Sequence, residues 1–238
     1  MKAFILAAGL GTRLYPYTSD RPKALVELGG VTLLERAIRK VQELDISEIV
    51  VNIHHFGSQI IEFLEVNHNF NVPVTISDER EALLDTGGAI LHARRFLDKK
   101  EPFLIYNVDV LSSIPLTELL AYHFMKGGLA TLAVRKRITD RNLVFNQDML
   151  LSGWRNLKTG EEKLVRQSAL LENFAFSGIQ IIQPELFPMI TESGKFSVVQ
   201  LYLRLAADND IYGYHDTSDY WMDLGKPDQL LAAGKMMC

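Results

Sequence analysis

Two cations, Arg13 and Lys23, lie on an irregular loop where they could bind phosphate groups. The loop, LAAGLGTRLYPYTSDRPKAL at residues 6–25, directly follows the first apolar run of the chain. A guanidinium offers a planar fork that matches phosphate oxygens, and an ammonium offers a compact charge. Gly9 and Gly11 would let backbone N–H groups approach a ligand closely, and the prolines would stiffen the loop. A surface loop with solvated charges is the alternative, but these features together favour a phosphate site.

Neither of two common phosphate-binding motifs accounts for this loop. The dinucleotide fingerprint G-x-G-x-x-G requires a third glycine at the position where Leu14 stands. The P-loop requires a lysine directly after a glycine, whereas Lys23 follows Pro22. Any phosphate chemistry of the loop must therefore use another arrangement.

Two aspartates in apolar surroundings are further candidates. Asp109 ends the apolar run FLIYNVD, where a turn residue or a helix cap is an equally good interpretation. Asp223 lies between Met222 and Leu224, and a carboxylate there needs a partner. That partner could be a hard cation, or a salt-bridge or hydrogen-bond donor of the protein itself. The residues alone leave these alternatives open.

Alternating strands and helices are predicted to position these groups. The predicted elements are strands at 2–8, 48–53, 72–76 and 103–110, and helices at 32–44, 58–66 and 87–97. Such alternation is typical of a parallel sheet, and ligands bind at the carboxyl ends of its strands. The loop after the first strand, the TGG at 86–88 and Asp109 all fall at that edge.

The pattern changes after about residue 128. LATLAVRKR, LVFN, MLLSGW and FAFSGIQII read as strands joined by turns, so this part is expected to be more antiparallel. A helix at 196–207, the short strands IYGYH and YWMDLG and a closing helix at 227–236 complete the chain. No linker or repeat interrupts it. We therefore predict one α/β domain over 1–238, with a nucleotide-binding half at about 1–127 and a mixed second half at about 128–238.

Composition narrows the class of protein further. The net charge is −4 and the basic residues are scattered, so we expect no nucleic-acid partner. The single cysteine, Cys238, excludes a disulfide within the chain and fits a reducing compartment. The start MKAFILAAG has a lysine and a short apolar run, but it is too short for a signal peptide and no segment approaches a membrane span. We expect a cytoplasmic protein without a membrane partner.

The loop closely resembles the signature of the sugar-nucleotide pyrophosphorylases, nucleotidyltransferases that join a nucleoside triphosphate to a sugar 1-phosphate. That signature is G-x-G-[ST]-R-[LM]-x-P followed by P-K, and it is matched by Gly9, Gly11, Thr12, Arg13, Leu14, Pro16, Pro22 and Lys23. LLDTGGAI at 83–90, NVD at 107–109, FSGI at 176–179 and WMDLG at 221–225 follow in family order. The resemblance therefore covers essentially the whole chain. It is strongest to compact members that use N-acetylmuramate 1-phosphate, or mannose or heptose 1-phosphate.

The resemblance implies a Rossmann-like nucleotidyltransferase fold with a mixed, mostly parallel central sheet flanked by helices. Arg13 and Lys23 are implied as catalytic cations, and Asp109 and Asp223 as ligands of Mg²⁺. The implied nucleotide-binding residues are Leu6, Ala8, Gly9, Gly11, Thr12, Arg13, Lys23, Gly87 and Gly88. The implied sugar-binding residues, in the second half, are Asn173, Ser177 and Gly178.

The chain departs from the family pattern at two places. The NGD motif of the family is replaced by NVD at residues 107–109, and the side chain of Val108 is expected to point into the sheet. The EKP segment that many relatives use near the sugar is replaced by EEKLVRQSALLENF. The acidic run DERE reads as a solvated loop, although Glu79 and Glu81 are candidates because this stretch lies near the base in some relatives.

The function that the resemblance implies is nucleotidyl transfer, with UTP favoured over GTP, to a sugar 1-phosphate, with release of pyrophosphate. One alternative is cytidylyl transfer to a non-sugar phosphate such as phosphocholine. Another is a regulatory module that binds a nucleotide or sugar nucleotide without catalysis, which the retained charged residues disfavour. The expected partners are the triphosphate and the sugar 1-phosphate, and the chain is expected to be a monomer or a homodimer.

Overall fold

The computed structural model describes residues 1–97 and 100–236, so Cys238 lies outside the described residues. Ten strands form its central sheet: β1 (Lys2–Leu6), β4 (Glu48–Ile53), β5 (Val74–Asp78), β6 (Phe103–Asn107), β8 (Ala130–Arg135), β9 (Arg141–Phe145), β10 (Leu151–Asn156), β11 (Glu162–Leu164), β12 (Glu172–Ile182) and β13 (Ile211–His215). Two small sheets pair β2 (Glu27–Leu28) with β3 (Val31–Thr32), and β7 (Val110–Ser112) with β14 (Trp221–Asp223).

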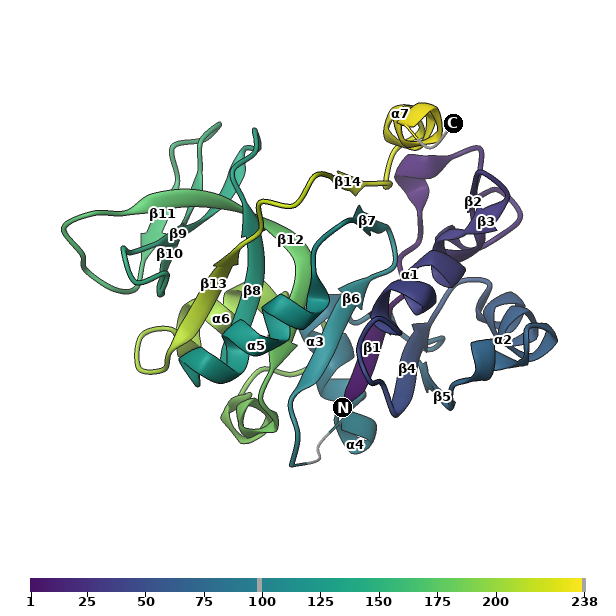
Figure 1. The fold of residues 1–238 in the computed structure, drawn as a ribbon, viewed down its shortest axis with the longest axis horizontal. Helices are drawn as coiled ribbons and strands as arrows, with labels where there is room; N and C mark the ends of the chain where they lie inside the picture. The colour runs from purple at the N-terminus through teal and green to yellow at the C-terminus, as the bar shows by residue number, and fades with distance from the viewer. Residues whose placement is uncertain (98–99, 237–238) are drawn as a thin grey trace.

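The central sheet is parallel in its first half and largely antiparallel in its second. The strand order is β11-β10-β9-β12-β6-β1-β4-β5, with β8 on β12 and β13 on β8 (Figure 1). Strands β6, β1, β4 and β5 are mutually parallel, whereas β12 runs antiparallel to β6, β8 and β9. The predicted mixed α/β sheet is therefore confirmed, with the change of pattern at the β6–β12 boundary.

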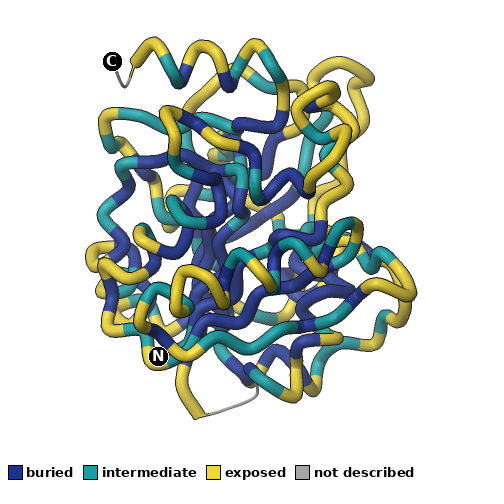
Figure 2. The backbone as a smooth tube through the Cα atoms, turned by 90° about the vertical axis from the view of Figure 1, so that its right-hand side faces the viewer, coloured by how far each residue is buried: buried dark blue, intermediate teal, exposed yellow. Residues whose placement is uncertain are grey.

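Helices cover both faces of this sheet. They are α1 (Leu33–Val41), α2 (Gly57–Val66), α3 (Asp85–His92), α4 (Arg94–Leu97), α5 (Leu116–Lys126), α6 (Val198–Leu205) and α7 (Pro227–Met236). Side chains of a strand point alternately to the two faces, so Ala3 and Ile5 pack in one apolar cluster and Phe4 in the other. The first cluster contains residues of α1, α2, α5 and α7, and the second contains residues of α3, α4 and α6. Figure 2 shows buried backbone through the centre and exposed turns around it.

Most predicted elements are present with shifted bounds. The hydroxyl of Thr32 accepts a hydrogen bond from the Glu35 amide at 3.1 Å, which is the predicted cap of the first helix. The helix predicted at 87–97 starts earlier, at Asp85, and is divided into α3 and α4. The strand predicted at 103–110 was too long, because β6 ends at Asn107 and Val110 belongs to β7, which pairs with β14 in a separate small sheet.

The short strands β2, β3 and β7 had no counterpart in the sequence prediction, and neither did α5 and β11. Helix α5 had a readable signal, since it follows a proline and buries Leu116, Leu119 and His123 at helical spacing. Strand β11 had none, because all three of its residues are exposed and no apolar alternation marks it. Over 1–97 and 100–236, no helix has the length and apolar character needed to cross a membrane.

Candidate active site

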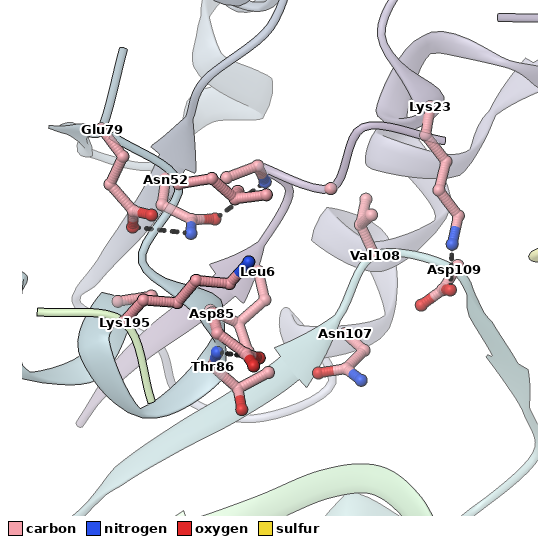
Figure 3. A pocket seen from close by; sticks show the side chains of 14 residues that line it. Leu6, Lys23, Asn52, Glu79, Asp85, Thr86, Asn107, Val108, Asp109 and Lys195 are labelled. Atoms are coloured by element: carbon pink, nitrogen blue, oxygen red, sulfur yellow. Dashed lines mark hydrogen bonds and ion pairs between the residues drawn. The ribbon is translucent and has the colours of Figure 1, made fainter. Parts of the chain in front are cut away.

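A cavity of about 310 Å³ opens at the carboxyl ends of β1, β4 and β6. This is the edge at which α/β sheets bind ligands. Its lining residues are Leu6, Ala8, Gly9, Lys23, Asn52, Glu79, Leu83, Asp85, Thr86, Ala89, Asn107, Val108, Asp109 and Lys195 (Figure 3). Figure 3 shows Lys23 and Asp109 at one end of it and Glu79 and Asn52 at the other.

The loop after β1 holds its two cations by local packing. Gly11 has a φ of 66°, and a Cβ there would stand 2.9 Å from Thr18 and 3.0 Å from Lys23, so both the backbone and the space require glycine. Leu14 is fully buried and anchors the turn. Lys23 is 8% exposed and lines the cavity, whereas Arg13 is exposed to solvent.

The end of the chain returns to this loop through β14. Asp223 pairs with Val110 in the β14–β7 ladder, and the Leu224 amide donates to the Asp109 carbonyl at 2.8 Å. These contacts bring Asp223 beside Asp109 although more than a hundred residues separate them in sequence. Asp109 also forms an ion pair with the ammonium of Lys23.

The geometry around Gly225 shows how closely the charged groups meet. A Cβ at Gly225 would stand 2.7 Å from Asp223 Oδ1, 2.9 Å from Arg13 Nη2 and 3.4 Å from Lys23 Nζ. Together with the Lys23–Asp109 ion pair, this places the two predicted cations and the two predicted carboxylates in one cluster. A side chain at position 225 would displace that cluster.

The donor set of this cluster suits a metal ion that takes most of its ligands from elsewhere. Among the described residues, no group of three or more acidic, histidine or cysteine side chains could hold an ion. Two neighbouring carboxylates, Asp109 and Asp223, are what Mg²⁺ typically takes from a protein when phosphates and water supply the other oxygens. The residues present therefore fit Mg²⁺ bound together with a polyphosphate.

The other end of the cavity is organised by Asn52 and Glu79. The Asn52 side-chain oxygen accepts from the amides of Ala7 and Ala8 at 2.6 and 3.2 Å, and its nitrogen donates to Glu79 Oε1 at 2.8 Å. Glu79 is only 3% exposed. The interpretation of DERE as a solvated loop is therefore wrong for Glu79. A sequence signal existed, since Asn52 is a polar residue inside an otherwise apolar strand.

The second carboxylate oxygen of Glu79 has a distinctive environment. Oε2 is buried and has no hydrogen-bond partner among the described residues. Desolvation by burial raises the pKa of Glu79, against the smaller opposing effect of the Asn52 hydrogen bond. Glu79 lines the cavity, so its unpaired carboxylate oxygen is a candidate acceptor for an N–H group of a ligand.

Glu79→Gln is expected to stabilise the ligand-free protein at pH 8, with a melting temperature higher by about 2–4 °C for each kcal/mol gained. A carboxyl with a raised folded-state pKa loses stability as pH rises from its unfolded pKa through the folded one, and the neutral amide removes that loss. Thermal melts at pH 5 and pH 8 should show the larger difference at pH 8. Asp78→Asn is the control, because Arg80 lowers the pKa of Asp78 and its neutralisation should not stabilise. A variant that melts lower than wild type at both pH values would contradict the expectation.

Gly87 and Gly88 occupy positions that packing explains. Their amides donate to the carbonyl of Phe196 at 2.9 and 3.3 Å. A Cβ at Gly87 would stand 2.4 Å from the Phe196 ring, and one at Gly88 would stand 2.4 Å from the Gly194 carbonyl. Their neighbours Asp85 and Thr86 line the cavity instead. Contact of the two glycines with a nucleotide stays a prediction.

A second cavity, of about 780 Å³, adjoins the first and shares Leu6, Asp85, Thr86 and Asn107 with it. Its remaining walls come from β9, β10, β11, β12 and α6, with Trp154, Lys163 and Phe176 among the side chains. Of these residues, only Phe176 belongs to a motif that the sequence analysis matched, FSGI at 176–179.

The three predicted sugar-binding residues lie near the second cavity but do not line it. Asn173 accepts a hydrogen bond from Arg155 at 3.1 Å. Ser177 is fully buried, and Gly178 has a φ of 75° and packs against the amide of Asn107. Val108 is buried in the core as expected, although it also lines the first cavity. The sugar assignment stays a prediction.

A cation-bearing loop after the first strand and two adjoining cavities at the carboxyl edge of the sheet are features of a Rossmann-like α/β fold that binds ligands at this edge. The chain belongs to the nucleotidyl transferase family, whose model matches residues 2–238.

Individual relatives support the same family assignment. The chain is 31% identical to N-acetylmuramate alpha-1-phosphate uridylyltransferase of Caulobacter vibrioides, over 97% of this chain and 94% of that protein. It is 28% identical to the mannose-1-phosphate guanylyltransferase catalytic subunit beta of Dictyostelium discoideum, over 98% of this chain and 63% of that protein. The chain thus spans about three fifths of the length of the guanylyltransferases that it matches.

Solved structures share the fold. HddC from Yersinia pseudotuberculosis in complex with GMP-PN has a TM-score of 0.76 at 19% identity, covering 100% of this chain and 99% of that one. UDP-glucose pyrophosphorylase from Acinetobacter baumannii has a TM-score of 0.80 at 18% identity, covering 98% of this chain and 91% of that one. The predicted nucleotidyltransferase fold is therefore confirmed.

Proposed function

We propose that the protein transfers a nucleotidyl group from a nucleoside triphosphate to a sugar 1-phosphate and releases pyrophosphate. The observation that carries this proposal is the convergence of Arg13, Lys23, Asp109 and Asp223 beside two adjoining cavities. One cavity would hold the nucleotide and the other the sugar. Two polyanions must meet in such a reaction, and the charged cluster stands at the phosphate end of the nucleotide cavity.

The reaction needs alignment and charge neutralisation more than proton transfer. An oxygen of the sugar 1-phosphate attacks the α-phosphorus, a new P–O bond forms, and the bond to the bridging oxygen breaks so that pyrophosphate leaves with the electron pair. The attacking phosphate is already an anion, so no general base is required. Arg13 and Lys23 would bind the phosphates and stabilise charge on the leaving group.

Asp109 and Asp223 would hold Mg²⁺. The ion, when bound with the triphosphate, would supply positive charge to the phosphate oxygens. Lys23 would then exchange its contact with Asp109 for contacts with phosphate. Both residues line the cavity, so both side chains are accessible to a bound phosphate.

The nucleotide that we favour is UTP, with GTP as the alternative. One relative that the chain covers almost completely is named a uridylyltransferase, while others are named guanylyltransferases. Cytidylyl transfer to phosphocholine and a non-catalytic binding module are the remaining candidates. The cytoplasmic location and a monomer or homodimer remain our expectations from the sequence.

A pyrophosphate-release assay tests the function directly. UTP, GTP, CTP and dTTP would each be combined with the 1-phosphates of N-acetylmuramate, mannose, heptose and glucose, and with phosphocholine. We expect Mg²⁺-dependent release with one sugar 1-phosphate and UTP or GTP. Release only with CTP and phosphocholine would favour the cytidylyltransferase, and no release with any pair would overturn the proposal.

A further inference from the structure

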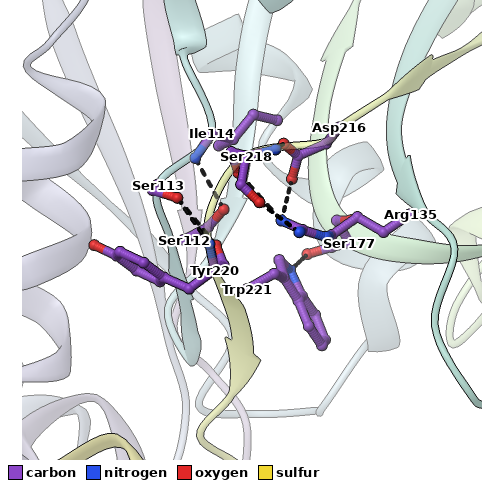
Figure 4. A network of polar contacts seen from close by, with 9 residues as sticks. All are labelled: Ser112, Ser113, Ile114, Arg135, Ser177, Asp216, Ser218, Tyr220 and Trp221. Carbon is purple, nitrogen blue, oxygen red and sulfur yellow. Dashed lines mark hydrogen bonds and ion pairs between the residues drawn. The ribbon is translucent and has the colours of Figure 1, made fainter. Parts of the chain in front are cut away.

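The indole ring of Trp221 is held in place from several sides. The strap between β13 and β14, residues 216–220, is fixed where Arg135 donates to the Asp216 carboxylate at 2.9 Å and to the Ser218 carbonyl at 2.6 Å (Figure 4). The Trp221 indole N–H donates to the Ser177 carbonyl at 2.8 Å. The ring is therefore a fixed platform beside Asp223.

The guanidinium of Arg137 stacks on this indole ring. Its guanidinium carbon lies 4.2 Å from the centre of the Trp221 ring, and Nη2 donates to the Phe176 carbonyl at 3.2 Å. The residue is exposed, and no ion pair of Arg137 is found among residues 1–97 and 100–236. A stacked guanidinium keeps its in-plane N–H groups available, and these match two phosphate oxygens.

Two neighbours place Arg137 between the charged cluster and the second cavity. Phe176, whose carbonyl it binds, lines that cavity. Trp221, on which its guanidinium stacks, stands two residues before Asp223 in β14. Arg13 and Lys23 reach the same cluster from the opposite half of the chain.

We infer that Arg137 binds the phosphate of the sugar 1-phosphate and orients it for attack. This inference rests on the proposed function. The donor phosphates already have two cations on the loop after β1, whereas the acceptor phosphate must lie where the two cavities meet. Arg137 is an exposed cation on the side of the second cavity, and stacking on the indole fixes the orientation of its guanidinium. Stacking with no ligand contact is the alternative role.

The test compares Arg137→Met with Lys136→Met. Both variants remove one positive charge from the same loop, but Lys136 already pairs with Glu172 at 2.6 Å and lies over Phe174, whereas Arg137 lies over Trp221. Arg137→Met should raise KM for the sugar 1-phosphate about ten- to a hundredfold and leave KM for the triphosphate within about twofold. Lys136→Met should change neither. Arg137→Lys should recover only part of the loss, because an ammonium restores charge without the planar fork.

Calorimetric titration of mannose 1-phosphate and N-acetylmuramate 1-phosphate, with no triphosphate present, separates the inference from the function. Weaker binding to Arg137→Met than to Lys136→Met, at unchanged melting temperature, supports the inference even if turnover is absent. Equal affinity in both variants, or no binding to wild type, would overturn it. A KM that rises equally for both substrates would also contradict it, because a structural role predicts that pattern.

Discussion

Lys23→Ala is expected to lower turnover at saturating substrates by about ten- to a hundredfold. The variant loses one charge-assisted contact to phosphate, worth roughly 1.5–3 kcal/mol. It should also lower the melting temperature, because the Asp109 side chain is only 18% exposed and loses its ion-pair partner. Arg13→Ala should lower turnover to a similar extent without that loss of stability, since Arg13 is exposed.

The Lys23→Ala/Asp109→Asn double variant separates the two effects. Neutralising Asp109 removes the unpaired carboxylate, so the melting temperature should recover while turnover stays low. Steady-state kinetics at saturating concentrations of both substrates, together with thermal melts, provide the measurements. Turnover close to wild type in both Lys23→Ala and Arg13→Ala would show that the loop does not bind the reacting phosphates.

Asp109→Asn and Asp223→Asn should each reduce turnover about ten- to a hundredfold and shift the Mg²⁺ response to higher concentrations. Each removes one carboxylate ligand while the side-chain shape is kept. The double variant should be far less than multiplicatively worse, because both residues would serve one ion. Asp223→Asn should retain the hydrogen bond from the Gly225 amide, which is 2.8 Å long.

Asp228→Asn is the matched control for the carboxylates. This exposed aspartate lies five residues beyond Asp223, in the first turn of α7, and its neutralisation should leave the Mg²⁺ titration unchanged. Strictly multiplicative losses at Asp109 and Asp223, with an unaltered Mg²⁺ dependence, would mean that the two carboxylates do not share an ion.

The two loop cations, Arg13 and Lys23, could be predicted from the local sequence. A glycine- and proline-rich loop with two cations after a buried strand is a local signal, and the structure places Lys23 in the cavity. The approach of Asp223 to Asp109 depends on the β14–β7 pairing, which was not predicted. The resemblance implied only that both carboxylates bind one Mg²⁺, and no local pattern indicated it. Strand alternation likewise fixed the edge at which these groups meet.

The remaining features of the site depend on burial and on contacts between distant segments, which a local sequence pattern does not show. Glu79 lies in an acidic run that reads as solvated, but its side chain bonds Asn52 and its amide donates to the Ile53 carbonyl, which hold it in a buried position. Gly87 and Gly88 match a nucleotide motif, yet their positions are set by a segment more than a hundred residues later. No sequence pattern marked Arg137 as a site residue. The orientation of its side chain depends on stacking with Trp221, which lies far from it in sequence.

Phosphorus NMR of the products tests nucleotidyl transfer most directly. The protein would be incubated with Mg²⁺, a triphosphate and each sugar 1-phosphate carrying ¹⁸O on its phosphate. We predict pyrophosphate and a nucleoside diphosphate sugar in which the ¹⁸O label is on the phosphate attached to the sugar, as attack by that phosphate on the α-phosphorus requires. Orthophosphate with a nucleoside diphosphate, or no pyrophosphate from any pair, would contradict nucleotidyl transfer.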